Sequence, residues 1–181
     1  MAPSQISIGD QVLVSGPVGR HGMAVMSQRD GVEFDSEIVS DVGPLHRLVA
    51  DLLADGVEVH AARDLTRGGL AAAMCELADP QRHGIALVEA DVLVPRDVAA
   101  ACGFLGIDPW HVANEGTMAV IVAGTDGARA ADVMRRRPEG TDAAQVGVVT
   151  GEHRGHVVAL TSLGTRRVVD PPMGEQLPRI C

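Results

Sequence analysis

The chain has 181 residues, with 24 acidic side chains against 15 basic ones, and its formal net charge is −9. This length suits one well-cored domain, and the negative charge argues against non-specific nucleic-acid binding, which needs a basic stripe. All the basic residues are arginine, so this chain supplies no lysine for a Schiff base or a Walker-type phosphate site.

The first part of the chain alternates a short apolar run, a glycine-rich turn and an amphipathic helix. Residues 11–15 are typical of a buried strand, and three glycines mark the turn at 16–22 before a helix expected over 23–28. Residues 44–55 carry an apolar stripe at helical spacing. Pro44 suits the first position of that helix and Gly56 its end.

The middle of the chain continues this alternation. A strand is expected at 57–62, and the segment 64–69 opens a second amphipathic helix that ends before Pro80. The other elements expected here are a strand at 85–88, a helix at 95–105, a buried strand at 117–122, and a helix from an N-cap at Thr125 to Arg137.

The last third has a different character. Short β-type runs at 146–149, 157–160 and 167–169 are separated by glycine and polar turns. From residue 171 the chain has prolines and no periodicity, which is typical of a tail. These elements predict an α/β (α+β) fold, a layered sandwich with a mixed sheet, over residues 1–170, followed by a flexible tail over 171–181.

The segment 64–69 (DLTRGG) is a candidate phosphate site. Glycines at a helix start leave backbone N–H groups accessible, and the helix dipole adds positive potential there. The guanidinium of Arg67 can add charged hydrogen bonds to the same anion. The alternative is structural: Gly68 and Gly69 permit a tight turn and close helix packing, with Thr66 as the N-cap.

Two further loops contain polar residues beside predicted strands. The glycine spacing at 16–22 matches no nucleotide-binding loop, so His21 is either a site residue or a helix-entry residue. Asn114, the only asparagine, precedes Glu115 and Gly116 just before the buried strand. Glu115 is a candidate general base, or else a solvated carboxylate at an Asx turn.

The three cysteines show no zinc-type or CxxC spacing, which argues against a structural metal or a disulfide framework. Cys75 and Cys102 fall in predicted helices, where packing roles are expected. Cys181 is the last residue, a thiol expected to be exposed, with Arg179 nearby to offset its terminal carboxylate. No apolar run approaches the length of a membrane span, and we expect a cytoplasmic protein.

Four segments together resemble the HypE family of hydrogenase maturation factors. Residues 64–69 resemble the D-x-T-R-G-G signature of aminoimidazole ribotide (AIR) synthetase-like proteins, and residues 114–116 resemble their N-E-G element. Residues 15–22 are similar to the S-G-x-x-G-x-H-G stretch of HypE, and residues 178–181 to its terminal P-R-I-C. The resemblance runs from about residue 8 to the end.

This resemblance implies an AIR synthetase C-terminal-domain-like fold and a carbamoyl acceptor. HypE proteins take a carbamoyl group from the carbamoyltransferase HypF onto the terminal cysteine and dehydrate it with ATP to a thiocyanate. The cyano group then passes to iron on the HypC–HypD complex of [NiFe]-hydrogenase maturation. The implied roles are Cys181 as acceptor and Glu115 as base; Asp64, Thr66, Arg67, Gly68 and Gly69 for ATP with Mg²⁺; and Asn114, His21 and Arg179 in support.

HypE proteins also carry an N-terminal domain that supplies much of the ATP site and the homodimer interface. This chain starts where that domain should end, so we expect an excised C-terminal domain rather than one product of a split gene, unable alone to complete the ATP-dependent step. Two alternatives remain. One is the C-terminal domain of a selenophosphate synthetase, an AIR synthetase or a thiamine-phosphate kinase; the other is a non-catalytic docking module.

Overall fold

The computed structural model describes residues 3–29, 38–79 and 82–171. The predicted tail over 171–181 therefore lies outside the described residues except for Pro171, and so do Arg179 and Cys181.

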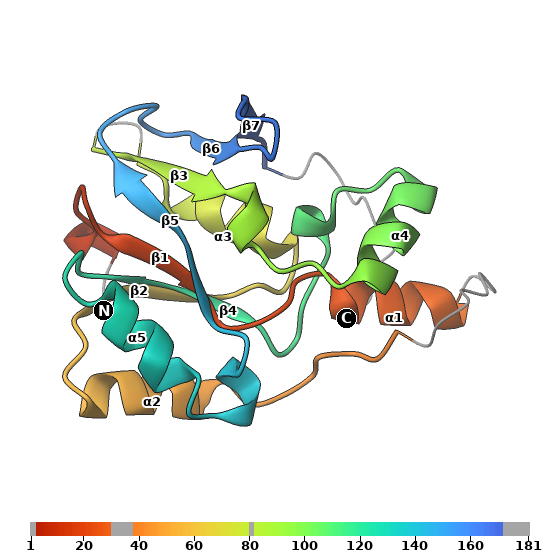
Figure 1. The fold of residues 1–181 in the computed structure, drawn as a ribbon, viewed down its shortest axis with the longest axis horizontal. Helices are drawn as coiled ribbons and strands as arrows, with labels where there is room; N and C mark the ends of the chain where they lie inside the picture. The colour runs from red at the N-terminus through yellow and green to blue at the C-terminus, as the bar shows by residue number, and fades with distance from the viewer. Residues whose placement is uncertain (1–2, 30–37, 80–81, 172–181) are drawn as a thin grey trace.

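One mixed sheet organises the described part of the chain (Figure 1). Its strand order is β2-β4-β1-β5-β3-β6-β7. The strands are β1 (Gln11–Val14), β2 (Val59–Asp64), β3 (Gly84–Val88), β4 (Met118–Val122), β5 (Ala144–Thr150), β6 (Val157–Leu160) and β7 (Arg166–Val169). The β3–β6 pair is parallel, and the other neighbouring pairs are antiparallel.

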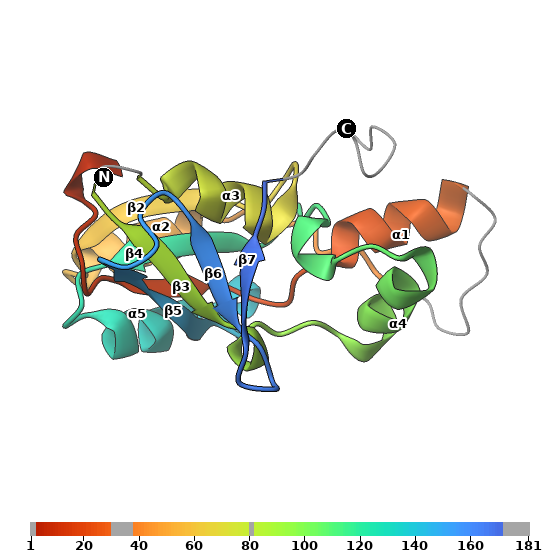
Figure 2. The same cartoon turned by 90° about the horizontal axis from the view of Figure 1, so that it is seen from above.

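Helices cover both faces of this sheet. α2 (His46–Ala54) and α5 (Gly127–Met134) pack over β2 and β4 on one face, and α3 (Gly69–Leu77) packs on the other. α1 (Arg20–Arg29) and α4 (Arg96–Leu105) form a separate apolar cluster at one end of the molecule (Figure 2). Four short 3₁₀ helices connect these elements: η1 (Pro3–Gln5), η2 (Glu89–Asp91), η3 (Pro109–His111) and η4 (Pro138–Gly140).

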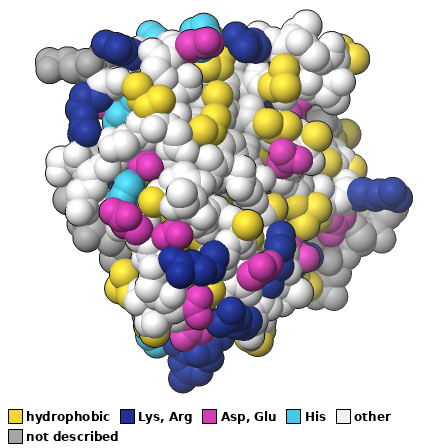
Figure 3. Space-filling view, turned by 60° about the vertical axis from the view of Figure 1, so that its left-hand side comes forward, with side chains coloured by type: hydrophobic (Ala, Val, Ile, Leu, Met, Phe, Trp, Pro, Cys, Tyr) yellow, Lys and Arg dark blue, Asp and Glu magenta, His cyan; other side chains and the backbone are white. Residues whose placement is uncertain are grey.

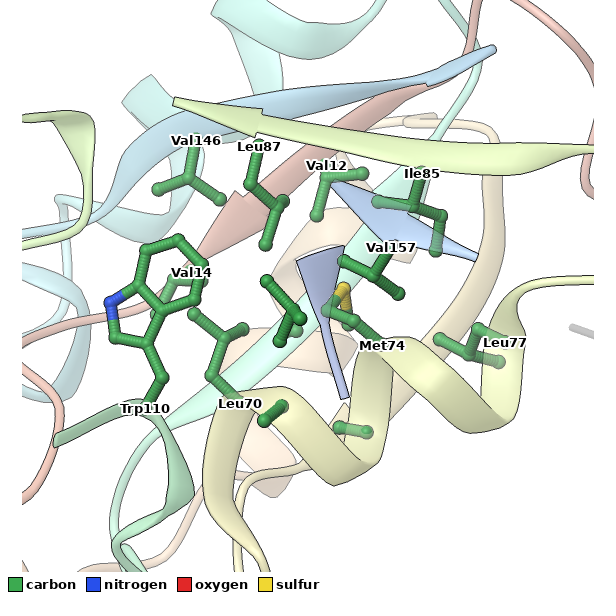
Figure 4. Packing of buried hydrophobic residues seen from close by; sticks show 14 of the residues in the cluster. Val12, Val14, Leu70, Met74, Leu77, Ile85, Leu87, Trp110, Val146 and Val157 are labelled. Atoms are coloured by element: carbon green, nitrogen blue, oxygen red, sulfur yellow. The ribbon is translucent and has the colours of Figure 1, made fainter. Parts of the chain in front are cut away.

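The alternation of side chains along the strands divides the core in two, because successive strand residues point to opposite faces. In β1, Leu13 contacts the cluster under α2 and α5, whereas Val12 and Val14 contact the cluster under α3. Figure 4 shows the cluster under α3, in which Trp110 of η3 packs beside the first turn of that helix. All five residues of β4 are buried, as its continuous apolar sequence predicts for an inner strand covered on both faces.

The layered α/β fold with a mixed sheet is confirmed, with corrections at element ends. α1 begins at Arg20, not at residue 23, since Met23 donates its backbone N–H to the Gly19 carbonyl and closes a helical turn around Gly22. α5 has its N-cap at Asp126, not Thr125, and ends at Met134. The strand expected at 57–62 runs from Val59 to Asp64.

The surface shows mixed charge. Over the face seen in Figure 3, arginines alternate with acidic side chains, and no large patch of one sign forms. Arg136 and Arg137, which follow α5, pair with Asp55 and Asp51 of the α2 region. Within the described ranges, no helix combines the length and the hydropathy needed to cross a membrane.

Candidate functional site

The three loops predicted from sequence meet at the side chain of Asn114. Its Oδ1 accepts a hydrogen bond from the Gly19 N–H at 2.7 Å, and its Nδ2 donates to the carbonyls of Leu65 at 3.2 Å and Val112 at 3.0 Å. Its own backbone N–H donates to the Leu65 carbonyl. Asn114 is fully buried, so these partners replace the water that its amide loses. The structure therefore brings the loops 16–22, 64–69 and 114–116 together.

The glycine pair at the start of α3 has a packing reason. Gly68 and Gly69 adopt left-handed backbone angles, with φ of 73° and 60°, which favour glycine. A Cβ atom on Gly69 would lie 2.5 Å from the carbonyl oxygens of Trp110 and Val112. Gly68, not Thr66, is the N-cap residue, and no side chain caps the helix. The expectation of a tight turn and close packing is confirmed; that of Thr66 as N-cap is wrong.

Polar groups beside this turn remain accessible to a ligand. Asp64, at the end of β2, and Arg67 are exposed, and Thr66 is partly exposed. Arg67 has no ion-pair partner within residues 3–29, 38–79 and 82–171. A guanidinium and a hydroxyl next to an uncapped helix start are a suitable setting for a phosphate.

Glu115 lies in a loop that a distant carboxylate holds by its backbone. The N–H groups of Glu115 and Gly116 each donate to the carboxylate of Asp41, at 3.1 Å in both cases. The Thr117 hydroxyl donates to the same carboxylate at 2.9 Å. Glu115 itself is partly buried. Sequence reasoning missed Asp41, because no local pattern links residues 74 positions apart.

His21 contacts the segment that contains Asp41. Its ring Nδ1 lies 2.9 Å from the Ser40 hydroxyl oxygen, which also accepts the Val42 N–H. His21 therefore stands in the first turn of α1 beside residues 40–42.

The C-terminal end of the described chain is anchored close to the same site. The ring Nε2 of His111 lies 2.9 Å from the Asp170 carbonyl oxygen, and the Arg167 guanidinium lies 4.7 Å from the centre of the Trp110 ring. Trp110 and His111 belong to η3, which packs against Gly69 at the start of α3. Arg167 and Asp170, near the end of the described chain, therefore lie against an element that borders the candidate phosphate site.

The described cysteines are poor candidates for nucleophiles. Burial raises the pKa of both Cys75 and Cys102 to about 11, with further contributions from Asp170 and Asp108 respectively. Both thiols are therefore protonated at neutral pH, and only a thiolate is strongly nucleophilic.

The described residues also form a pocket away from the candidate site. A pocket of about 450 Å³ opens on the sheet and contains none of the predicted site residues. Its lining comes mainly from β1, β3, β5 and β6, with Asp91 and Arg166. No group of three or more metal-binding side chains occurs in the described part of the chain.

Known proteins share both the sequence and the fold. Residues 7–159 match the family model "AIR synthase related protein, C-terminal domain". The chain is 47% identical, over 176 residues, to a protein of Rhizobium leguminosarum bv. viciae named carbamoyl dehydratase HypE; the match covers 96% of this chain and 50% of that protein.

Two solved structures show the same likeness. One is the hydrogenase maturation protein HypE in complex with ATP, with a TM-score of 0.91 and 39% identity, covering 99% of this chain and 55% of that one. The other is HypE in a HypE–HypF complex, with a TM-score of 0.87 and 39% identity, covering 94% and 55%.

The chain spans about half the length of the curated relatives that it matches. Over that half, the fold likeness and the match to the family model agree. The chain therefore belongs to the family of AIR synthase related C-terminal domains, in which it is similar to the carbamoyl dehydratase HypE.

Proposed function

We propose that this chain is the acceptor-bearing domain of a HypE-type carbamoyl dehydratase of [NiFe]-hydrogenase maturation. In this proposal Cys181 accepts a carbamoyl group, and the full-length protein dehydrates it with ATP to a thiocyanate. The convergence of the loops 16–22, 64–69 and 114–116 on one buried asparagine, Asn114, is the observation that carries the proposal, together with the likeness to proteins of that name.

The chemistry suits the side chains at the site. A thiol carries the carbamoyl group as an S-carboxamide, and dehydration then removes its oxygen and both N–H protons to leave S–C≡N. ATP converts the oxygen into a phosphate leaving group. Thr66 and Arg67, with the backbone of Gly68, bind ATP phosphates at the start of α3, and Asp64 lies next to them for the accompanying Mg²⁺. Glu115 accepts one of the two protons of the carbamoyl nitrogen, and the departing phosphate takes up the other.

Cys181 is the proposed acceptor for two reasons. The alternatives are Cys75, which is partly buried, and Cys102, which is buried, and burial raises the pKa of both thiols. In addition, Cys181 follows only eleven positions after Asp170, whose carbonyl is hydrogen-bonded to η3 beside the start of α3. The ten residues from 172 to 181 can span at most about 36 Å when extended, enough for the thiol to serve both a partner and the site.

The proposed partners follow from the relatives. HypF, which forms a complex with HypE in a solved structure, supplies the carbamoyl group, and the HypC–HypD complex receives the cyano group. We place the ATP-dependent step, the homodimer interface and the rest of the nucleotide site in a protein of the relatives' full length, because this chain matches only half of it. The compartment we propose is the cytoplasm.

A chimera tests this proposal directly. This chain replaces the matched half of the Rhizobium relative, and the purified chimera is incubated with HypF, carbamoyl phosphate and ATP. We expect a gain of about 43 Da for the carbamoyl group, followed by a loss of about 18 Da as water is removed. A chimera that is carbamoylated but never loses water, although it binds ATP, would contradict the proposed dehydratase function.

Glu115→Gln in this chimera separates the two steps. Carbamoylation of Cys181 should be retained, since HypF performs that transfer, whereas the dehydration rate should fall by about 10²- to 10⁴-fold because the proton acceptor is lost. Time-resolved intact mass measures both steps on one sample. Dehydration at the wild-type rate would remove Glu115 from its proposed role.

A further inference from the structure

Residues 38–43 form a strap across the loop that holds Glu115. Ile38 at one end is buried in the apolar cluster of α1 and α4, and Gly43 at the other donates its N–H to the Glu115 carbonyl. Between them, Ser40 contacts the ring of His21. The strap is therefore fixed on both sides of Asp41.

Both oxygens of the Asp41 carboxylate accept hydrogen bonds from residues 115–117. Oδ1 accepts the Glu115 N–H, while Oδ2 accepts both the Gly116 N–H and the Thr117 hydroxyl. The two N–H groups can only donate, one to each oxygen, so the arrangement needs an acceptor at both oxygens, which a carboxylate provides and a neutral amide does not. Hydrogen bonds of this kind, to an ionised acceptor, are also stronger than neutral ones.

Gly116 shows how closely the strap lies against the loop. A Cβ atom at this position would fall 1.6 Å from the Asp41 carbonyl oxygen and 2.7 Å from the Asp41 carbonyl carbon. Both are backbone atoms and cannot move without displacing the strap. The glycine of the 114–116 loop is thus explained by contact with Asp41, with no ligand needed.

We propose that Asp41 is a positioning residue for Glu115. It contacts the backbone on either side of the Glu115 Cα atom, through the Glu115 and Gly116 N–H groups, and so fixes the direction in which that side chain leaves the loop. This inference rests on the proposed role of Glu115 as the proton acceptor. Catalytic efficiency depends on such placement, because a displacement on the order of 1 Å can cost about 100-fold in rate.

Amide hydrogen exchange on this chain tests the contact without any activity. In Asp41→Asn, the amides of Glu115 and Gly116 should exchange about tenfold faster or more, because a lost hydrogen bond lowers the free energy of local opening. Asp126→Asn is the matched control. Asp126 also accepts a backbone N–H, from Glu58 at 2.7 Å. Asp126 follows β4, however, whereas the 114–116 loop precedes that strand. Unchanged exchange at both loop amides in Asp41→Asn would overturn the inference.

A double-mutant cycle in the active chimera tests whether Asp41 acts through Glu115. Asp41→Asn should slow dehydration by about 10-fold or more and leave carbamoylation unchanged; Asp41→Glu, which keeps the carboxylate, should recover part of the rate. In a Glu115→Gln background, Asp41→Asn should have little further effect. If the reductions in dehydration rate caused by the two substitutions simply multiply, the result contradicts positioning. A wild-type chimera that never dehydrates would contradict the proposed function itself.

Discussion

Asn114 and Gly116 show how single residues define this site. From a fully buried position, Asn114 satisfies the distant backbone groups of Gly19 and Leu65 and the nearby Val112 carbonyl, and Gly116 leaves room for the Asp41 backbone. The two residues flank Glu115 on either side. The 114–116 loop is therefore constrained on both sides of the proposed base before any substrate binds.

Gly116→Ala should lower the free energy of unfolding by about 2–4 kcal/mol, because its methyl group has to displace the backbone of the strap. Chemical denaturation measures the change. Gly103→Ala, in α4 with no atom within 4 Å of an added Cβ, is the matched control and should be neutral or raise stability by up to about 1 kcal/mol. Equal effects of the two substitutions would contradict the close approach.

His60 makes the stability of the fold depend on pH. Burial alone would lower its pKa, but hydrogen bonds to Asp10 at 2.6 Å and Glu58 at 3.3 Å outweigh burial and raise the pKa above 6.5. The protonated form is thus favoured more in the folded state than in the unfolded state. Its contribution is fully present below about pH 6.5 and is lost as the pH rises through the raised value.

We therefore expect the free energy of unfolding of the wild-type chain to fall as the pH rises from about 6.5 through the raised pKa of His60, and to fall less in His60→Gln. His46→Gln, at an exposed position on α2, is the control for histidine titration in general. Denaturant unfolding across this range gives the comparison. The same pH dependence in wild type and His60→Gln would rule out this role.

At the scale of elements, α2 and α5 are joined at their ends by arginine–carboxylate pairs. Arg137 contacts both oxygens of Asp51, at 2.5 and 2.9 Å, and its hydrogen bond holds the pKa of Asp51 below the usual range. This contribution to stability is present above the unfolded pKa of Asp51, near 3.8, and is lost as the pH falls through the lowered value.

Arg137→Lys should lower the midpoint of thermal unfolding by at most about 4 °C, because the pair is partly exposed and screened by water. Lysine cannot reproduce the two-point contact of the guanidinium. Arg96→Lys, on the exposed surface of α4, is the control. The difference between the two variants should shrink in high salt; a difference that salt leaves unchanged would contradict an electrostatic cause.

Most elements could be predicted from local patterns, because helical stripes and apolar runs are local properties. The strand order could not, since nothing in the runs at 11–15 and 146–149 says that β1 pairs with β5. The start of α1 was predicted late because three glycines suggested a turn, whereas Gly22 lies within the helix and donates to the Ala113 carbonyl. Long-range contacts outweighed the local signal there.

The loops of the candidate site could be located from sequence because each of their motifs is a run of a few consecutive residues. The sequence placed the loops at 64–69 and 114–116 correctly at strand ends, but Asp41 carried no signal. Its partners lie more than 70 positions away, and its neighbours suggest only a turn before a helix. Such a residue is found by asking which acceptor satisfies the backbone donors of a motif.

At the scale of the whole molecule, the described chain is a layered core whose last described strand, β7, ends beside η3. η3 links the start of α3 to the C-terminal end of the described chain, because it packs against Gly69 and also contacts the Asp170 carbonyl. We propose that this domain carries the acceptor and part of the phosphate site. The rest of a protein of the relatives' full length then completes the ATP site needed for dehydration.

The most direct test is the intact mass of this chain after incubation with HypF, carbamoyl phosphate and ATP. The account predicts a gain of about 43 Da, located at Cys181 by peptide mapping and absent from Cys181→Ser. Cys75 and Cys102 serve as internal controls in the same digest. No gain in mass, or a carbamoyl group found on Cys75 or Cys102, would contradict the central claim.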